Sequence, residues 1–397
     1  MSDEMNDFNG EDSFTEVTEE SWFGRIGGAI KGIVVGIVLF IIAFPILWLN
    51  EGRAVNTEKK INFAKDNVIA VSADKVNKEN ESKLIYIVGQ AKTSELLKDD
   101  NFNISTNAIK LTRTVSIYQW EEEETTKTVK KMGGGKKTIK TYTYKKDWSD
   151  KLIDSNSFKK KTYKNSEGLQ IQRSNPVTIP YESKELVAKD VTVGAFKLSN
   201  RLINKINNAE SLKLTQKPKN FPKKIEIIDG FYFIGKDYAK PAIGDMKIKF
   251  NIVKPQEVSI IARQSNNGLS EYQTPYGTYE QLSYGNKPIA AMIASAKAGN
   301  STMTWILRII GFALMFFGIT LIFKPLSVIA DVVPFIGDLV GIGTSIIAFL
   351  IAAPATLITI GTAWLFYRPL LGAPLIAVAI FLIFTLIKKK KGCQSAS

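Results

Sequence analysis

Four charged residues in the last third of the chain are candidates for a position at membrane depth: Arg308, Asp331, Asp338 and Arg368. Ionisable groups at membrane depth are costly and usually functional. Asp331 and Asp338 are seven residues apart, which places both carboxylates on one face of a helix. Sharing a proton, they would suit an intramembrane hydrolase; alternatively, they would line an ion pathway. We favour a third interpretation, in which both acids lie in water at the membrane surface, because their apolar segment is too short to bury them.

A second polar group follows the first apolar stretch at Asn50, Glu51 and Arg53. We expect it to cap the helix and clamp it at the interface rather than to catalyse a reaction. Arg308 and Arg368 should lie at the same boundary, so a ring of polar pairs would tie the first apolar helix to the later ones. Trp and Tyr favour such interfaces. The predicted boundary and interhelix contacts are Asn50, Glu51, Arg53, Trp305, Arg308, Trp364, Tyr367 and Arg368.

Several kinds of chemistry are excluded by composition. The chain has no histidine, and its one cysteine is Cys393. A disulfide framework within the chain, a structural zinc site and a triad with a histidine base are therefore excluded. Gly133–Gly135 do not form a phosphate-binding loop, since no G-x-x-x-x-G-K-[ST] pattern is present. We predict no enzymatic activity, no cofactor, no metal and no small-molecule substrate.

The net charge of +14 first suggests a nucleic-acid partner. Most lysines are instead scattered over a polar middle region. The dense cluster Lys388–Lys391 directly follows an apolar run, a placement that an anionic cytoplasmic leaflet favours. The basic stretch Lys159–Lys164 has only Tyr163 for base stacking. We therefore predict a lipid bilayer, and not nucleic acid, as the partner.

Four apolar stretches are long enough to cross a bilayer. The first occupies Gly32–Leu49 within a predicted helix at 22–50, and we expect Pro45 to kink or end it and Gly52 to follow its last turn. The others lie at 306–323, 339–360 and 370–387. Gly28, Gly32 and Gly36 recur on one helical face, a pattern that allows close helix packing but also reflects the glycine content common in membrane helices.

The rest of the chain divides by composition. We predict a disordered acidic N-terminus at 1–21, a β-rich extracytoplasmic or lumenal domain at 51–303, and a three-helix membrane cluster at 304–387. That cluster would contain an interfacial segment near 325–338 and be followed by a basic cytoplasmic tail at 388–397. The clearest hairpin pairs Thr114–Lys130 with Lys136–Trp148. The fold class is an α+β membrane protein with four transmembrane helices.

Orientation follows from the positive-inside rule. Lys388–Lys391, Arg25 and Lys31 should be cytoplasmic. With four crossings, both termini would be cytoplasmic and the large domain would lie on the opposite side.

The chain resembles the LUMA family, the proteins called transmembrane protein 43, from about Trp22 to Ile387. The segments that carry the resemblance are Phe44–Val55, Tyr118–Glu121, Trp148, Ile261–Gln264 and Trp364–Leu370. The resemblance implies four membrane spans, a large lumenal domain, self-association and no established catalysis. Animal members reside in the endoplasmic reticulum and inner nuclear membrane. The lack of histidine and the many Lys and Asn residues suggest a prokaryotic or AT-rich source. The host would be the plasma membrane in a prokaryote and the endoplasmic reticulum or nuclear envelope in a eukaryote.

These observations favour a non-enzymatic, self-associating membrane scaffold that forms a homo-oligomer and contacts other membrane proteins. An ion channel or pathway using Asp331 and Asp338 is the alternative, and an intramembrane hydrolase with the same acids is a third hypothesis. The sequence does not identify the oligomer number, the partner proteins or a ligand of the extramembrane domain.

Overall fold

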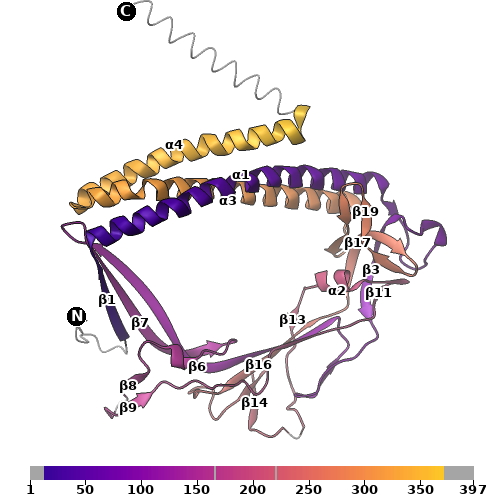
Figure 1. Ribbon diagram of the computed structural model, residues 1–397. Coiled ribbons are helices and arrows are strands. Elements are labelled where there is room, and N and C mark those ends of the chain that lie inside the picture. The colour runs from indigo at the N-terminus through magenta and orange to yellow at the C-terminus, as the bar shows by residue number, and fades with distance from the viewer. Residues whose placement is uncertain (1–12, 165–166, 220, 371–397) are drawn as a thin grey trace, which may run out of the picture.

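Three long helices lie side by side along one side of the molecule, and a β-rich domain occupies the other side (Figure 1). The computed structural model describes residues 13–164, 167–219 and 221–370. The helices are α1 (Trp22–Asn67), α3 (Ile289–Ala330) and α4 (Pro334–Tyr367), and each is long and apolar enough to cross a membrane. The chain is thus an α+β membrane protein, and its described residues include one N-terminal and two C-terminal apolar helices. The predicted helix at 370–387 and the tail at 388–397 lie outside the described residues, apart from Leu370.

Helix α1 is longer than the predicted helix at 22–50. It contains Pro45 in its interior and ends at Asn67, so the predicted end near Leu49 is wrong. Membrane helices tolerate proline because neighbouring helices and local adjustments satisfy the freed backbone groups. Gly52 does not follow the last turn. It lies under the ring of Tyr367, where an added Cβ would be 2.7 Å from the Cζ atom.

Helix α3 also extends beyond the predicted span. It begins at Ile289 and passes through Lys324 and Pro325 before it ends at Ala330. The predicted interfacial segment at 325–338 is instead the end of α3, a short turn and the start of α4. Pro334 is in the first turn of α4, where its missing N–H is not needed for the helix. Pro354 lies inside α4.

Small residues set the spacing between α1 and α3. An added Cβ at Gly36 would lie 2.5 Å from the carbonyl oxygen of Gly318, so the two backbones are in direct contact there. Gly32 is looser, with its nearest neighbour at 3.9 Å, and an added Cβ at Gly28 would meet only Glu20, also at 3.9 Å. The common core of the three helices consists of Ala43, Leu47, Met315, Ile319, Ala348 and Ala352.

The β-domain contains two large sheets that share one hydrophobic core. The first has the order β1-β7-β6-β16-β15-β14, with β10 added to β6 and β13 added to β16. Its strands are β1 (Ser13–Glu20), β6 (Lys110–Lys130), β7 (Lys136–Ser149), β10 (Lys184–Val187), β13 (Glu210–Ser211), β14 (Ile225–Ile228), β15 (Phe231–Ile234) and β16 (Met246–Val253).

The second sheet has the order β2-β3-β11-β12-β18-β17-β21, and β3 also pairs with β17. Its strands are β2 (Ile69–Ala70), β3 (Leu84–Thr93), β11 (Val191–Val193), β12 (Phe196–Lys197), β17 (Gln256–Ser265), β18 (Gly268–Ser270) and β21 (Gln281–Tyr284). Three small hairpins complete the domain: β4 (Leu97–Asp99) with β5 (Ile104–Thr106), β8 (Thr162–Lys164) with β9 (Gln170–Gln172), and β19 (Tyr272–Thr274) with β20 (Gly277–Tyr279). One short helix, α2 (Asn200–Lys205), lies between β12 and β13.

The predicted hairpin is confirmed and forms a long exposed ribbon from β6 and β7. In its register Glu121 opposes Lys145, and their charged groups are 3.9 Å apart. Strand β1 adds a third strand to the ribbon by pairing with β7, so the predicted disorder at 1–21 is wrong for Ser13–Glu20. Opposite charges explain this pairing, since Glu16, Glu19 and Glu20 oppose Lys140, Lys137 and Lys136. We call β1, β7 and the distal part of β6 the ribbon.

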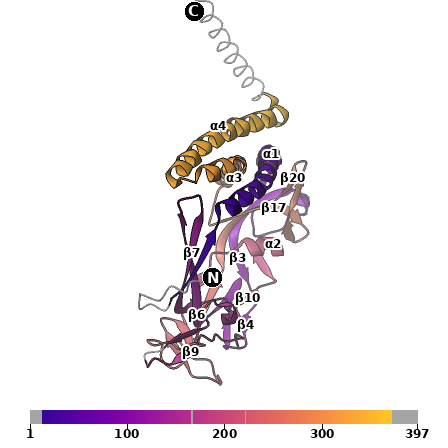
Figure 2. The same ribbon diagram turned by 60° about the vertical axis from the view of Figure 1, so that its left-hand side comes forward.

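The β-domain contacts the helices at two well-separated places (Figures 1 and 2). The tip of the ribbon lies against the start of α1 and the α3–α4 turn, where Trp22 Nε1 donates to the carbonyl of Val328 and Gly133 N donates to that of Val332. At the other end, the last turns of α1 and the first turns of α3 join β3, β17 and β20 in a second apolar core. That core consists of Ile61, Ala64, Leu84, Ile261, Tyr279, Met292 and Ile293.

Candidate functional site

A buried carboxylate joins the three long helices where the apolar stretch of α1 ends. Glu51 on α1 is 1 % exposed. Its two oxygens accept hydrogen bonds from Nε and Nη2 of Arg308 on α3, at 2.7 and 2.9 Å, and Oε2 also accepts from Trp364 Nε1 on α4 at 2.7 Å. The Arg308 guanidinium also stacks near the rings of Trp305 and Trp364, at 4.8 and 5.5 Å from their centroids. A buried charge needs such complete pairing to be tolerated.

A hydrogen-bond network continues from this pair along α1 and α3. Asn50 Nδ2 donates to the carbonyl of Thr304 at 3.0 Å, and Arg53 donates to the side chains of Asn50, Asn300 and Thr304 at 2.9–3.0 Å. Asn300 in turn donates to the carbonyl of Ala54 at 2.9 Å. We call Asn50, Glu51, Arg53, Asn300, Thr304, Arg308 and Trp364 the Glu51 cluster. It fixes the register of the helices through directional bonds.

The end of α4 is held against α1 next to this cluster. Arg368 Nη2 donates to Glu58 Oε2 at 2.6 Å, and both side chains are partly exposed. Tyr367 covers Gly52, and Trp48 lies within ring contact of Tyr367, with centroids 6.0 Å apart. All eight boundary residues predicted from the sequence therefore lie near one another at this end of the bundle.

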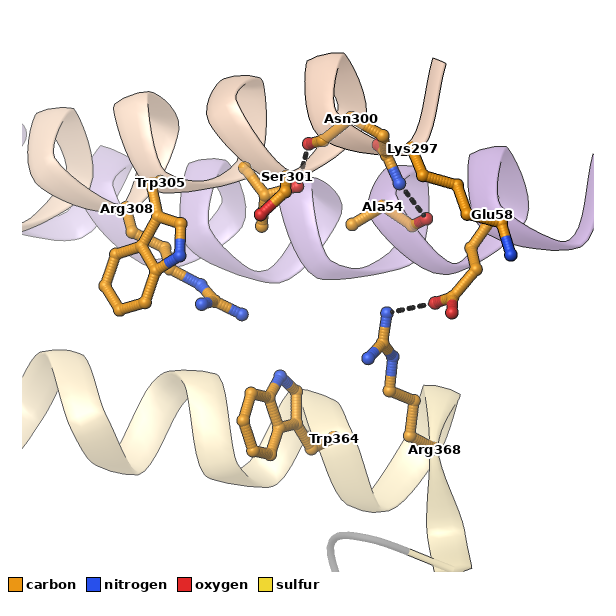
Figure 3. Close-up of a pocket in the computed structure, with 10 residues that line it drawn as sticks. Ala54, Glu58, Lys297, Asn300, Ser301, Trp305, Arg308, Trp364 and Arg368 are labelled. Carbon is orange, nitrogen blue, oxygen red and sulfur yellow. Dashed lines mark hydrogen bonds and ion pairs between the residues drawn. The ribbon is translucent and has the colours of Figure 1, made fainter. Parts of the chain in front are cut away.

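A cavity of about 290 Å³ opens beside the Glu51 cluster, between α1, α3 and α4 (Figure 3). Arg308, Lys297 and Arg368 bring three cationic side chains to it, and Glu58 brings one carboxylate. Trp305 and Trp364 form part of its wall. The cavity thus combines positive charge with amphipathic aromatic rings at the edge of an apolar helix bundle.

A second charged cluster lies at the opposite end of the bundle, at the ribbon tip. Asp331 is 1 % exposed and forms ion pairs with Arg25 of α1 and with Lys130 of β6, whose Nζ is 2.6 Å from Oδ1. Lys130 Nζ also lies 2.7 Å from Oδ1 of Asp338, and Arg25 Nη1 donates to the carbonyl of Gly134 at 2.5 Å. We call Arg25, Lys130, Asp331 and Asp338 the Asp331 cluster. It joins the two helix ends to the domain.

The Lys130 ammonium is held in its charged form. Partial burial alone lowers the pKa of this lysine, but the hydrogen bonds and charges of Asp331 and Asp338 outweigh it, so the pKa lies above its ordinary value. A lysine between the two acids opposes the sharing of one proton that an aspartic dyad needs. The Asp338 side chain is 65 % exposed, whereas Asp331 is buried between Arg25 and Lys130, contrary to the expectation that both acids lie in water.

One of these contacts bears on the predicted topology. The predicted topology separates Arg25 from the large domain by a membrane, whereas Arg25 donates a hydrogen bond to Gly134 in the turn at the ribbon tip. A strand pair with unpaired edges is not stable in hydrocarbon. Hydropathy and charge counting describe the helices alone and contain no information on how far the ribbon reaches.

Sequence reasoning missed the polar residues that face the predicted ones. Glu58, Lys297 and Asn300 lie in helix turns beyond the apolar windows and fall within the predicted extramembrane domain, and Thr304 is the first residue of the predicted membrane cluster. Continuing the helical periodicity of α3 backwards from Arg308 would have placed Thr304 and Asn300 on the same face, four and eight residues earlier. Lys130 had no local signal, because its partners follow it by 201 and 208 residues.

Comparison with known proteins gives a consistent result. The sequence model of the family described as Transmembrane protein 43 matches residues 117–369. The human Transmembrane protein 43 is 32 % identical over 368 residues, which cover 88 % of each chain. The Drosophila melanogaster Transmembrane protein 43 homolog is 29 % identical over 342 residues, covering 83 % of this chain and 87 % of that protein. No solved structure matches. The chain therefore belongs to the transmembrane protein 43 family, and it is an integral, multi-pass membrane protein.

Proposed function

We propose that this protein is a non-enzymatic membrane scaffold that self-associates through its membrane helices. The observation that carries the proposal is the double attachment of the β-domain. It meets the bundle at the Asp331 cluster and again at the apolar core around Ile61 and Tyr279. Two separated attachments hold domain and helices as one body, which is what a platform for other proteins requires.

The use of the buried charges supports a structural role. Glu51 and Asp331 are both 1 % exposed, and each is paired with basic side chains from other elements. Carboxylates engaged in this way are not available as a general acid or base. The two acids that would serve an ion pathway, Asp331 and Asp338, are bridged by Lys130. These pairings weigh against the channel and hydrolase hypotheses.

Contacts between copies would use a face other than the glycine face of α1, because Gly36 is occupied by Gly318 within the chain. The outer face of α4 is the better candidate. Leu350 and Leu357 on α4 are 63 % and 68 % exposed, and an added Cβ at Gly343 or Gly361 would meet no atom within 4 Å. Small residues on a lipid-facing helix allow a second helix to approach closely.

The mass of the detergent- or nanodisc-solubilised particle tests self-association. Light scattering with a cross-linking control should give a defined oligomer, and the double variant Gly343→Leu with Gly361→Leu should reduce its mass. Gly27→Leu on α1 is the matched control, because this glycine also has no neighbour within 4 Å. A monomeric wild-type protein would contradict the scaffold proposal and direct attention to a heterologous partner or a transported ion.

We further propose that the start of α1, the α3–α4 turn and the tip of the ribbon face the same aqueous compartment. The contacts of Arg25 with Gly134 and of Trp22 with Val328 support this. Single cysteines at Phe23 and Met132, two exposed positions, in a Cys393→Ser background would be labelled from each side of sealed vesicles. Labelling from one side supports the proposal. Labelling from opposite sides would mean that the ribbon tip does not contact the start of α1 in the membrane and that the predicted topology holds.

We also propose which membrane holds this protein. The composition, with no histidine and many Lys and Asn residues, supports the plasma membrane of a prokaryote rather than the endoplasmic reticulum or nuclear envelope.

A further inference from the structure

The cavity beside the Glu51 cluster has an excess of positive charge. Lys297, Arg308 and Arg368 face it, against the single carboxylate of Glu58 (Figure 3). Even when the buried Glu51 is counted with its partner Arg308, the cations outnumber the acids. Its volume of about 290 Å³ is near the lower end of the range that binds small ligands, roughly 300–1,000 Å³.

Several donors around the cavity are not used within the described residues. Arg308 bonds to Glu51 through Nε and Nη2, which leaves Nη1. Arg368 bonds to Glu58 through Nη2 alone. Within residues 13–164, 167–219 and 221–370, neither Lys297 Nζ nor Ser301 Oγ has a hydrogen bond or ion pair. The cavity therefore offers guanidinium, ammonium and hydroxyl donors at once.

This donor set fits one kind of ligand. A phosphate group carries negative charge and several acceptor oxygens, and guanidinium groups match it with paired N–H donors while a lysine adds a point charge. We propose that the cavity binds a phosphate group, and that its source is the headgroup of an anionic phospholipid. Basic pockets between transmembrane helices are suited to such headgroups.

The position of the cavity favours a lipid source over a soluble phosphate. Trp305 and Trp364 stand at its wall, as amphipathic rings do at headgroup level. One turn further along α3, Ile309 is 63 % exposed, and on α4 Ile358 is 64 % exposed. These apolar side chains continue from the cavity along the bundle, where the acyl chains of a bound lipid would lie.

The experiment uses the purified full-length protein in detergent, titrated separately with short-chain phosphatidylglycerol, short-chain phosphatidylcholine and inorganic phosphate. Native mass spectrometry counts the bound molecules, and the change in intrinsic tryptophan fluorescence, to which Trp305 and Trp364 contribute at the cavity wall, reports occupancy. Lys297→Gln is the test variant, since this lysine is exposed and takes part in no ion pair among the described residues. Lys65→Gln is the matched control, because it removes an exposed charge from the same end of the bundle without lining the cavity.

We expect one phosphatidylglycerol per chain, bound about tenfold more weakly by Lys297→Gln, as for the loss of one charge-assisted contact, and unchanged by Lys65→Gln. Equal competition by inorganic phosphate would support the phosphate site but make its source a free phosphate. Equal binding of phosphatidylcholine, equal effects of the two variants, or no bound molecule in any titration would overturn the proposal. Unchanged thermal unfolding of Lys297→Gln without lipid shows that the variant is folded.

Discussion

The carboxylate of Glu51 on α1 and the guanidinium of Arg308 on α3 form a two-pronged ion pair, with hydrogen bonds of 2.7 and 2.9 Å. The two residues are 257 positions apart in the chain, with all of the β-domain except β1 between them. Trp364 on α4 donates a hydrogen bond to the same carboxylate, so the Glu51 side chain alone fixes the relative positions of three helices.

Replacing Glu51 should destabilise the protein far more than replacing the partly exposed Glu58. In Glu51→Gln, the Arg308 charge stays buried without its counter-ion, at a cost of about 3–5 kcal/mol. Glu58→Gln breaks a partly exposed pair with Arg368, worth ~0–1 kcal/mol. Thermal unfolding in detergent measures both. The double variant Glu51→Leu with Arg308→Met should recover much of the loss, and equal effects of the two single variants would contradict the account.

Gly36→Ala should weaken the packing of α1 on α3. The new methyl group would lie 2.5 Å from the Gly318 carbonyl oxygen and 3.0 Å from Cβ of Leu321, and overpacking of this kind costs ~1–3 kcal/mol. Gly32→Ala is the control on the same face, because its nearest neighbour is 3.9 Å away. There alanine should be neutral or slightly stabilising, since it favours the helix over glycine by up to ~1 kcal/mol. If Gly36→Ala and Gly32→Ala lowered the unfolding midpoint equally, the close contact of Gly36 with Gly318 would be excluded as the cause.

Gly134→Ala should release the ribbon tip from the helices. An added Cβ at this position overlaps the ring of Trp22, whereas at Gly133 it would meet nothing within 4 Å. Both glycines have positive φ, +79° and +83°, so both substitutions carry a similar backbone strain. Limited proteolysis of the ribbon should therefore speed up in Gly134→Ala well beyond Gly133→Ala. Similar rates would mean that backbone strain alone explains the effect.

Alkaline pH should loosen the second attachment of the domain through Tyr279. Burial raises the pKa of this phenol from 10.0 to about 12, and the hydroxyl donates to Gln281 Oε1 at 2.6 Å. Because the unfolded chain ionises first, the contribution of Tyr279 to stability is complete below pH 10 and is lost as the pH rises toward 12. The difference in tyrosinate absorbance between the wild type and Tyr279→Phe should titrate near the higher value. Titration near pH 10 in the folded protein would refute the burial argument.

The sequence predicts which helices and strands form, but not where the helices begin and end. The alternation of the two strands at Thr114–Lys130 and Lys136–Trp148 specifies a hairpin without any tertiary information. The apolar windows locate all three described helices, but not their polar extensions, such as Glu51–Asn67 of α1. Those turns are helical because they pack against the β-domain and α3, and a hydropathy window contains no record of that packing.

The candidate site also has a part that the sequence predicts and a part that it does not. Residues predicted at the membrane boundary, such as Glu51 and Arg368, lie together because each had to follow or precede an apolar run. The pairing of Asp331 with Arg25 and Lys130 depends on the reach of a ribbon and on the sharp α3–α4 turn. Spacing within one helix suggests that Asp331 and Asp338 act as a pair, whereas the three-dimensional arrangement gives them a common lysine.

The ribbon also makes the helix bundle and the β-domain a closed, rigid frame. Strand β6 has 21 residues and α1 has 46, so each measures about 70 Å at ~3.3 and ~1.5 Å per residue. With the domain fastened at both ends of the bundle, α1 cannot slide along α3 without breaking one fastening. A bilayer of changing thickness would have to be met by tilting the whole frame or deforming the lipid around it. Tension applied to the domain would load both ends of the bundle together.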